Sequence, residues 1–413
     1  MRKKKAEESV DENITEVRCP KCKGWCGVLH SSVPRYAITI EGRIDYIRTV
    51  YRCRSSRCLK HRSPFDEELG LKEKEHFTPL VQKKIAWAGA MITSYDKASE
   101  GMKELTELAV SPKEMHRISE YKGQDAVDLQ DKEVFDLGRP ASPSLPVPVE
   151  NFPETVVLEM DGTCVMGRDG EGHEVKCATV FGLDSRKKTG RKERPVLINR
   201  SYCATSKGIS VFGSMVWAMS VSWGVKTAKR IVIIGDGGDW IWKYSRERFN
   251  FAYSDGSIQR PIEILDFYHA AENLTKARDI IFKDSELKRG EKWYKGWVDK
   301  IKKGKVDKLI SELDKRSALI EDADRKKELE IRASYFRGHK DRMNYPDYEK
   351  LGLPIGSGAI EGTCKNLIKG RMACVGQRWD SENNIERMTA LRVRIFNKKW
   401  DDLWPTIKSK KAA

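Results

Sequence analysis

Short apolar runs alternate with longer helical patterns through the second half of the chain. Runs rich in β-branched and apolar residues predict strands, and stretches with helical periodicity predict helices. The run RIVIIG before Asp236 is wholly apolar after its first residue and is typical of a strand buried on both faces. The predicted elements are, in chain order, strands at 155–165, 174–183 and 194–205, a helix at 208–225, a strand within 230–240, a helix at 239–249, a strand at 261–267 and a helix at 268–282.

This order, β-β-β-α-β-α-β-α, predicts the fold class. Three antiparallel strands followed by α/β crossovers are the order of the RNase H-like fold, so we expect an α/β protein with an RNase H-like core. Topology alone says nothing of function, which must be argued from a site.

Composition and spacing divide the chain into four regions. We expect a cysteine-containing module at 1–65, a helical region at 77–136, a proline-rich linker at 139–155 and one large α/β unit at 156–400. A long, charged helical insertion is expected within that unit, at about 275–350.

Charge and hydropathy limit the kinds of molecule that the protein is expected to bind. The 413 residues are 39% hydrophobic and 33% charged, with a formal net charge of +16. Such an excess suits a polyanion such as DNA, although an ordinary basic protein would show it as well. No apolar run is long enough to cross a bilayer, and the start MRKKKAEESVDEN lacks the apolar stretch of a signal peptide. We therefore expect a cytoplasmic protein with no membrane partner.

Three acidic residues are the candidate catalytic groups. Asp161 lies in the first predicted strand, and Asp236 follows the apolar run RIVIIG, where ligands gather at the carboxyl ends of strands. Asp236 could instead cap the next helix, but Asp239 stands in the better capping position. Glu361 falls in the first turn of a helix that follows the segment GSG, which is also an ordinary place for a glutamate. Three such carboxylates could hold two Mg²⁺ ions for phosphodiester chemistry.

Seven segments carry a family resemblance. The chain resembles the ISKra group of bacterial insertion-sequence transposases, relatives of the Mutator-like superfamily, and the matching segments span nearly all of the chain after the linker. They are EMDGTCV (159–165), HEVKCATVFG (173–182), VIIGDGGDWIW (232–242), ILDFYHAAENL (264–274), YFRGHKDRMNY (335–345), GLPIGSGAIEG (352–362) and KGRMACVGQRWD (369–380).

The resemblance implies a DDE transposase that cuts and joins DNA. It places the catalytic, metal-binding triad on Asp161, Asp236 and Glu361, with Mg²⁺ or Mn²⁺ as cofactor. Asp266 and His269 match the family's D-x-x-H signature and are expected to brace the metal site or contact phosphate. The implied partners are double-stranded transposon ends and target DNA, bound by a homo-oligomer on the bacterial nucleoid.

The first 58 residues contain a candidate zinc site. Cys19 and Cys22 form a CPKC pair, and Cys53 and Cys58 form a wider CRSSRC pair with strand-like sequence between the two. Four thiolates suit tetrahedral zinc, so we predict a zinc-ribbon-like module. Three nearby residues are alternative zinc ligands: Cys26, His30 and His61. Three further cysteines lie in predicted strands, where we expect core positions: Cys164, Cys177 and Cys203.

Residues 94–126 resemble a helix-turn-helix. One helix is expected at about 96–108, and the next should begin with Ser111 as N-cap and Pro112 at the first helical position. A plain helical hairpin would fit the same pattern. If the second helix reads DNA, the contacting side chains are Lys113, His116 and Arg117.

Two other functions share these features. A transposase-derived DNA-binding protein without catalysis would not need the three carboxylates. A hydrolytic nuclease of the same fold would cut DNA without transferring strands.

Overall fold

The computed structural model describes residues 15–138, 152–188, 195–252 and 258–404. The chain forms two compact units, one made of residues up to 126 together with those from 398, and the other of residues 127–397. Most of the linker expected at 139–155 lies outside the described residues, and strand β5 (Thr155–Met166) begins at its end.

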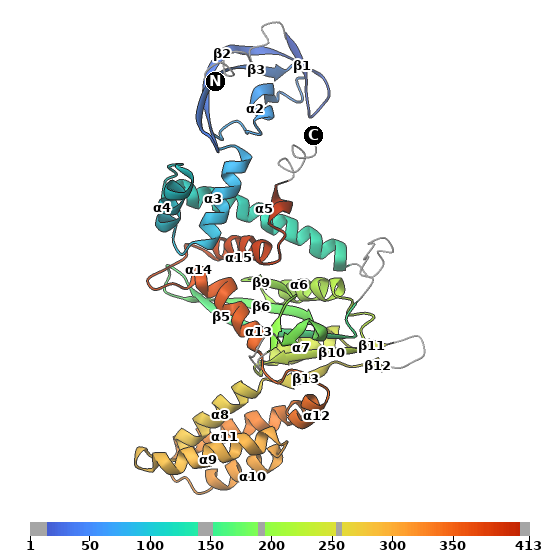
Figure 1. Ribbon diagram of the computed structural model, residues 1–413, viewed down its shortest axis with the longest axis vertical. Coiled ribbons are helices and arrows are strands. Elements are labelled where there is room, and N and C mark those ends of the chain that lie inside the picture. Colours follow the sequence, from blue (N-terminus) through green and yellow to red (C-terminus); the bar gives the residue numbers. More distant parts are fainter. Residues whose placement is uncertain (1–14, 139–151, 189–194, 253–257, 405–413) are drawn as a thin grey trace. The chain divides into compact units, whose positions relative to one another are not determined.

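The first unit begins with a four-stranded antiparallel sheet in the order β1-β2-β3-β4 (Figure 1). The long hairpin of β2 and β3 turns at Gly42, whose φ of +114° is a conformation that glycine adopts readily. The strands are β1 (Glu16–Arg18), β2 (Trp25–Thr39), β3 (Gly42–Cys53) and β4 (His61–Arg62), and the short helix α2 (Pro64–Glu68) follows them.

Three helices complete the first unit: α3 (Pro79–Met91), α4 (Tyr95–Thr106) and α5 (Pro112–Gly138), the last of which continues into the second unit. The Ser111 hydroxyl accepts a hydrogen bond from the Glu114 backbone N–H at 3.2 Å, as an N-cap does. The left-handed Glu107, with φ +59°, ends α4. Local capping chemistry therefore sets the α4–α5 turn where the sequence predicts it.

The second unit is built on a five-stranded mixed sheet in the order β13-β10-β5-β6-β9. The central strand β5 pairs antiparallel with β6 and parallel with β10, and β10 is also parallel to β13. The remaining strands of this sheet are β6 (Gly172–Gly182), β9 (Ser201–Thr205), β10 (Arg230–Gly235) and β13 (Ile262–Leu265). The protein is therefore mixed α/β.

Two expectations about these strands are wrong in detail. The strand expected at 194–205 is interrupted, because β8 (Pro195–Leu197) pairs with β7 (Arg186–Lys188) in a separate small sheet and only β9 joins the main one. Cys164 is exposed, whereas Cys177 and Cys203 are buried as predicted. The far end of β5 alternates between buried and exposed positions, and Cys164 falls on the exposed face.

Helices cover the sheet. α6 (Ile209–Ser222) and α7 (Asp239–Arg248) share one apolar cluster with β5, β10 and β13. α15 (Glu382–Phe396) packs against β9, where the buried Glu386 carboxylate accepts the Thr205 hydroxyl at 2.8 Å. The other short elements here are η1 (Leu183–Ser185), β11 (Phe251–Ala252), β12 (Ile258–Gln259) and η5 (Trp400–Leu403), the last in the first unit.

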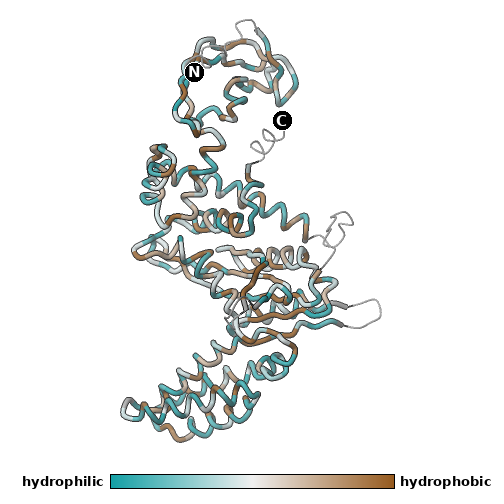
Figure 2. The backbone as a smooth tube through the Cα atoms, viewed as in Figure 1, coloured by the Kyte–Doolittle hydropathy of each residue, from teal (hydrophilic) through white to brown (hydrophobic). Residues whose placement is uncertain are grey.

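A run of helices from Phe267 to Lys350 separates β13 from the C-terminal part of the unit, and it covers the range of about 275–350 where a helical insertion is expected. Trp297 is buried in its core and Trp293 packs beside it, with ring centroids 6.3 Å apart. Along these helices the backbone alternates teal and brown in Figure 2, as expected for helices with one apolar face. They are α8 (Phe267–Ile281), η2 (Asp284–Glu286), α9 (Leu287–Lys302), α10 (Val306–Ser317), α11 (Ala323–His339), η3 (Lys340–Arg342) and α12 (Tyr345–Lys350).

No helix in the described part of the chain combines the length and the apolar character needed to span a membrane.

Candidate functional site

Three aspartates belong to three adjacent parallel strands: Asp161 lies within β5, and Asp236 and Asp266 directly follow β10 and β13. In the register of β5 and β10, Glu159 is opposite Ile234, and in that of β10 and β13, Gly235 is opposite Leu265. Continuing both registers aligns Asp236 with Asp161 on one side and with Asp266 on the other. Neighbouring strands are about 4.8 Å apart, so the sheet brings three aspartates to one edge.

Glu361 reaches the same region from a helix 200 residues further along the chain. It lies in the first turn of α13 (Gly358–Thr363), as predicted, and α13 continues through the π-helix η4 (Cys364–Lys369) into α14 (Gly370–Met372). α13 packs against β5 and β6, and the Cys364 thiol is 3.8 Å from the Asp161 carboxylate. Within the described residues the Glu361 carboxylate has no hydrogen-bonding partner.

The carboxylates influence one another's protonation. Burial raises the pKa of Asp161, and the negative charge of Asp236 adds to this effect. Burial also raises the pKa of Glu361, and Asp266 and Asp161 contribute in the same direction. Burial and neighbouring negative charge both disfavour the ionised carboxylates, and a nearby cation would oppose both effects.

Asp266 is fully buried and ties three segments together. As N-cap of α8 its side chain accepts the Tyr268 backbone N–H at 2.7 Å, and it also accepts the Ser357 backbone N–H at 3.1 Å and the Ser357 hydroxyl. The His269 ring nitrogen Nδ1 is 3.1 Å away. Burial would raise the pKa of Asp266, but the hydrogen bonds from His269 and Ser357 outweigh it and lower that pKa. The same contact with Asp266 raises the pKa of His269 to about 9, so the imidazole is charged at neutral pH.

Glu361 lies nearest to this pair. Ligand atoms of Asp266, His269 and Glu361 lie within 4.8 Å of one another, and among the described residues Asp161, Asp236 and Glu361 form no group that tight. The structure therefore brings all five predicted residues into one neighbourhood, with Glu361 closest to the D-x-x-H pair.

Glu159 is a site residue that the sequence interpretation missed. It lies two residues before Asp161 and so on the same face of β5, and its buried carboxylate accepts the backbone N–H of Ile360 at 2.9 Å and that of Ala359. Burial raises its pKa to about 8. The signal that could have found it was a lone acidic residue inside the apolar run TVVLEM.

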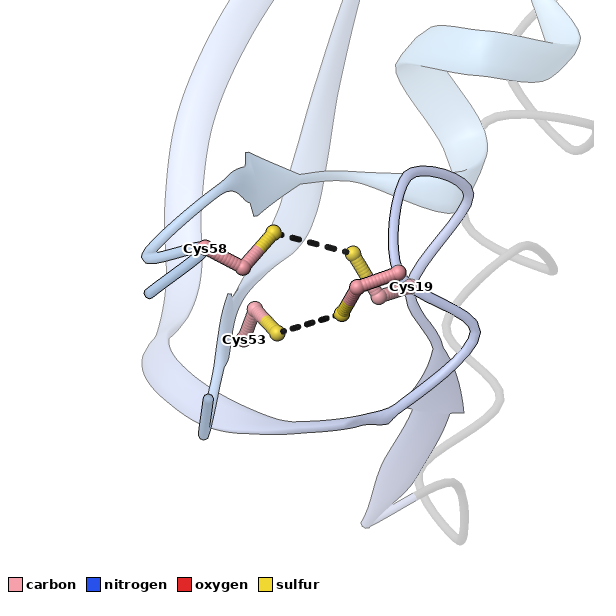
Figure 3. Close-up of side chains that lie close together, drawn as sticks. Cys19, Cys53 and Cys58 are labelled. Carbon is pink, nitrogen blue, oxygen red and sulfur yellow. Dashed lines mark hydrogen bonds between the residues drawn. The ribbon is translucent and has the colours of Figure 1, made fainter. Parts of the chain in front are cut away.

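The predicted cysteine site forms within the first unit. Sulfur atoms of Cys19, Cys22, Cys53 and Cys58 lie within 4.8 Å of one another. Figure 3 shows the side chains of Cys19, Cys53 and Cys58 close together. Cys19 and Cys58 are 3.7 Å apart and Cys22 and Cys53 are 3.4 Å apart, between sulfurs. Thiolates around a tetrahedral zinc, with bonds of about 2.3 Å, are about 3.8 Å apart, so these four residues could hold such an ion.

The rival ligands are outside this group. Among the described residues Cys26, His30 and His61 are not part of a ligand cluster. Cys26 is fully buried, and burial raises the pKa of its thiol to about 11, whereas a hydrogen bond from the Cys22 backbone N–H lowers the pKa of Cys19 to about 6.

The residues predicted to contact DNA lie in the first turns of α5. Lys113 and Arg117 are exposed and four residues apart, hence on one helix face. Arg117 pairs with Glu114 at 2.8 Å, and His116 packs edge-on against Tyr95 with ring centroids 5.2 Å apart.

No protein-family model matches the chain, and a search of curated proteins found no match.

Proposed function

We propose that this protein is a metal-dependent DNA transposase with an RNase H-like catalytic core. The observation that carries the proposal is the alignment of Asp161, within β5, with Asp236, which directly follows the adjacent parallel strand β10, and with Glu361 on α13 close to them. The strand order β13-β10-β5-β6-β9, antiparallel on one side of β5 and parallel on the other, supports the RNase H-like assignment.

The donor set fits Mg²⁺ or Mn²⁺. Carboxylate oxygens are the ligands that hard cations prefer, and burial together with the neighbouring carboxylates raises the pKa values of Asp161 and Glu361. Asp161, Asp236 and Glu361 would hold the metal ions. Bound there, divalent ions activate the attacking oxygen and stabilise the departing one during phosphodiester cleavage and strand transfer.

Asp266 and His269 are assigned a bracing role because they already bind each other and the neighbouring backbone. The Asp266 carboxylate accepts hydrogen bonds from Tyr268 and Ser357, and it also contacts the His269 ring nitrogen. Asp266 orients the loop before α13, and the positive charge of His269 offsets the charge of Glu361 and attracts phosphate.

The thiol group of the first unit is proposed to be a structural zinc site. Four cysteines leave no position for a substrate, which is typical of structural rather than catalytic zinc. With α4 and α5, this unit would recognise the double-stranded transposon ends, and the protein would act as a homo-oligomer in the bacterial cytoplasm.

Glu361→Gln tests the catalytic proposal. The variant keeps the size of the side chain but loses the charge that would bind metal, so we expect Mg²⁺-dependent cleavage of a duplex carrying the DNA that flanks the gene to fall by about 100-fold or more. Binding of that duplex, measured by gel shift, should survive.

The matched control is Glu382→Gln, an exposed glutamate in the first turn of α15. Its effect measures the interaction of a first-turn negative charge with the helix dipole alone, which stabilises a protein by about 0.3–1 kcal/mol. Glu361→Gln cleaving as fast as this control would refute the catalytic role, and nicks without joined products from the wild type would indicate a hydrolytic nuclease instead.

A further inference from the structure

A cavity of about 810 Å³ lies between α7 and α11, beside the candidate active site. Its wall includes Trp240, Trp242, Tyr335 and His339, with Lys243 and Arg246 among its charged residues. This volume is in the range of pockets that enclose a small ligand, about 300–1,000 Å³.

Two residues of the cavity wall contact the turn that contains Asp236. The Tyr335 hydroxyl donates a hydrogen bond to the Asp236 carbonyl oxygen at 3.1 Å. Gly237 has φ +111°, and a Cβ at that position would be 3.0 Å from the Tyr335 ring and 3.3 Å from Nε2 of His339. The turn that holds Asp236 therefore packs on two residues of the cavity wall.

Two buried polar atoms of the wall have no hydrogen-bonding partner among the described residues: Nε1 of Trp242 and Nδ1 of His339. Both side chains are more than nine-tenths buried, at 2% and 8% exposed, and their ring centroids are 6.2 Å apart. Buried polar groups are normally satisfied, so these two mark a part of the wall whose polar groups are not all satisfied within the chain.

The charges at the cavity favour an anion. Arg342 is already neutralised by Glu263 at 2.6 Å and lies over the Trp242 ring at 4.5 Å, so it stiffens the wall. Lys243 and Arg246 are exposed on one side of α7, and of the described residues that line the cavity only Asp239 is acidic. Arg246 forms no ion pair within the described residues.

We propose that this cavity binds one unpaired nucleotide of the DNA strand beside the cleaved phosphodiester, with the base against Trp240 and the backbone phosphate at Arg246 and Lys243. Aromatic faces and cations together are the usual recognition elements for single-stranded nucleic acid. The inference rests on the proposed transposase function and identifies where an unstacked nucleotide is held during cleavage.

The test uses the full chain without divalent metal and a fluorescent single-stranded oligothymidylate, with binding measured by anisotropy. Trp240→Ala should weaken binding by about tenfold because the base can no longer stack, and Trp240→Phe should restore most of it. Arg246→Ala should lower the dependence of log affinity on log salt by about 0.7. The matched control is Arg248→Ala, which is exposed on the same helix but does not line the cavity.

Affinity and salt dependence unchanged in Trp240→Ala and Arg246→Ala would overturn the nucleotide site. If Mg²⁺-dependent cleavage of duplex DNA persists in that case, the proposed function stands without it. A wild-type chain that binds the duplex but not the oligothymidylate would also overturn the site alone. Binding of neither DNA would refute both proposals, and circular dichroism of each variant checks that it is folded.

Discussion

Glu159 connects the strand that carries Asp161 to the helix that carries Glu361. It precedes Asp161 by two positions along β5, and its carboxylate accepts the N–H groups at the start of α13. A buried carboxyl group at a helix N-terminus accepts hydrogen bonds from donors that would otherwise lack partners. A single side chain thus links two candidate catalytic residues that are 200 positions apart in sequence.

We predict that Glu159→Ala will unfold more readily and cleave DNA more slowly. The change leaves buried N–H groups without acceptors, which costs about 1–3 kcal/mol for each unsatisfied group. Chemical denaturation and Mg²⁺-dependent cleavage are the two measurements. Glu159→Gln keeps one carbonyl acceptor, so it should lose less stability and less cleavage activity than Glu159→Ala.

The control for this prediction is Glu154→Ala. Its carboxylate is exposed and pairs with the surface Lys229, an interaction that contributes little. Equal loss of stability in Glu154→Ala and Glu159→Ala would show that the hydrogen bonds of Glu159 do not stabilise the position of α13.

At the scale of elements, the loop before α13 is positioned by close packing. A Cβ at Gly356 would be 2.6 Å from the Tyr268 ring, whereas a Cβ at Gly358 would meet nothing within 4 Å. The loop between them contains Ser357, which binds Asp266. Glycine at position 356 therefore allows the loop to lie close to Tyr268 of α8. At position 358 no steric contact requires a glycine.

The two glycines make a matched pair. Gly356→Ala should lower the free energy of unfolding by about 1–3 kcal/mol and slow cleavage, because the loop or the Tyr268 ring must move to make room for the methyl group. Gly358→Ala places a better helix former in α13 and should be neutral or stabilise by about 0.4–1 kcal/mol. Thermal unfolding of both variants provides the comparison, and similar melting temperatures would contradict this account.

The segments that carry Cys19, Cys22, Cys53 and Cys58 form a second local element, and we expect a bound metal ion to hold them together. We predict one zinc per chain in the purified protein, and its loss in Cys22→Ser, because that serine removes one of four thiolate ligands. Elemental analysis measures the metal content. Cys26→Ser is the control, since Cys26 is buried beside the group but is not part of it. Zinc retained in Cys22→Ser and lost in Cys26→Ser would reverse the ligand assignment.

At the scale of the whole molecule, the net charge of +16 predicts DNA binding that weakens with salt. If α5 binds phosphates, the double variant Lys113→Ala/Arg117→Ala should bind the flanking duplex less tightly, and its salt dependence should fall by about one unit for each phosphate no longer neutralised. Lys327→Ala, an exposed lysine of α11, removes charge elsewhere and is the control. A double variant with the affinity and salt slope of Lys327→Ala would exclude α5 from recognition.

Local signals in the sequence determined most of the elements. Ser111 and Pro112 marked the start of α5, the apolar run before Asp236 marked β10, and the GSG segment placed Glu361 in the first turn of α13. Such features depend on capping, periodicity and backbone preference within a few residues, so they can be interpreted without the fold.

Tertiary structure alone decided which residues meet. The hydrogen bonds of Glu159 with α13 and of Asp266 with Ser357 join segments 201 and 91 positions apart, for which the chain has no periodic signal. His339 belongs to a basic stretch that would suit a solvated face, yet it is buried in a cavity wall because α11 packs beside the Asp236 turn. Strand pairing and helix packing depend on which surfaces find complementary partners across the whole chain, and that selection is made only when the protein folds.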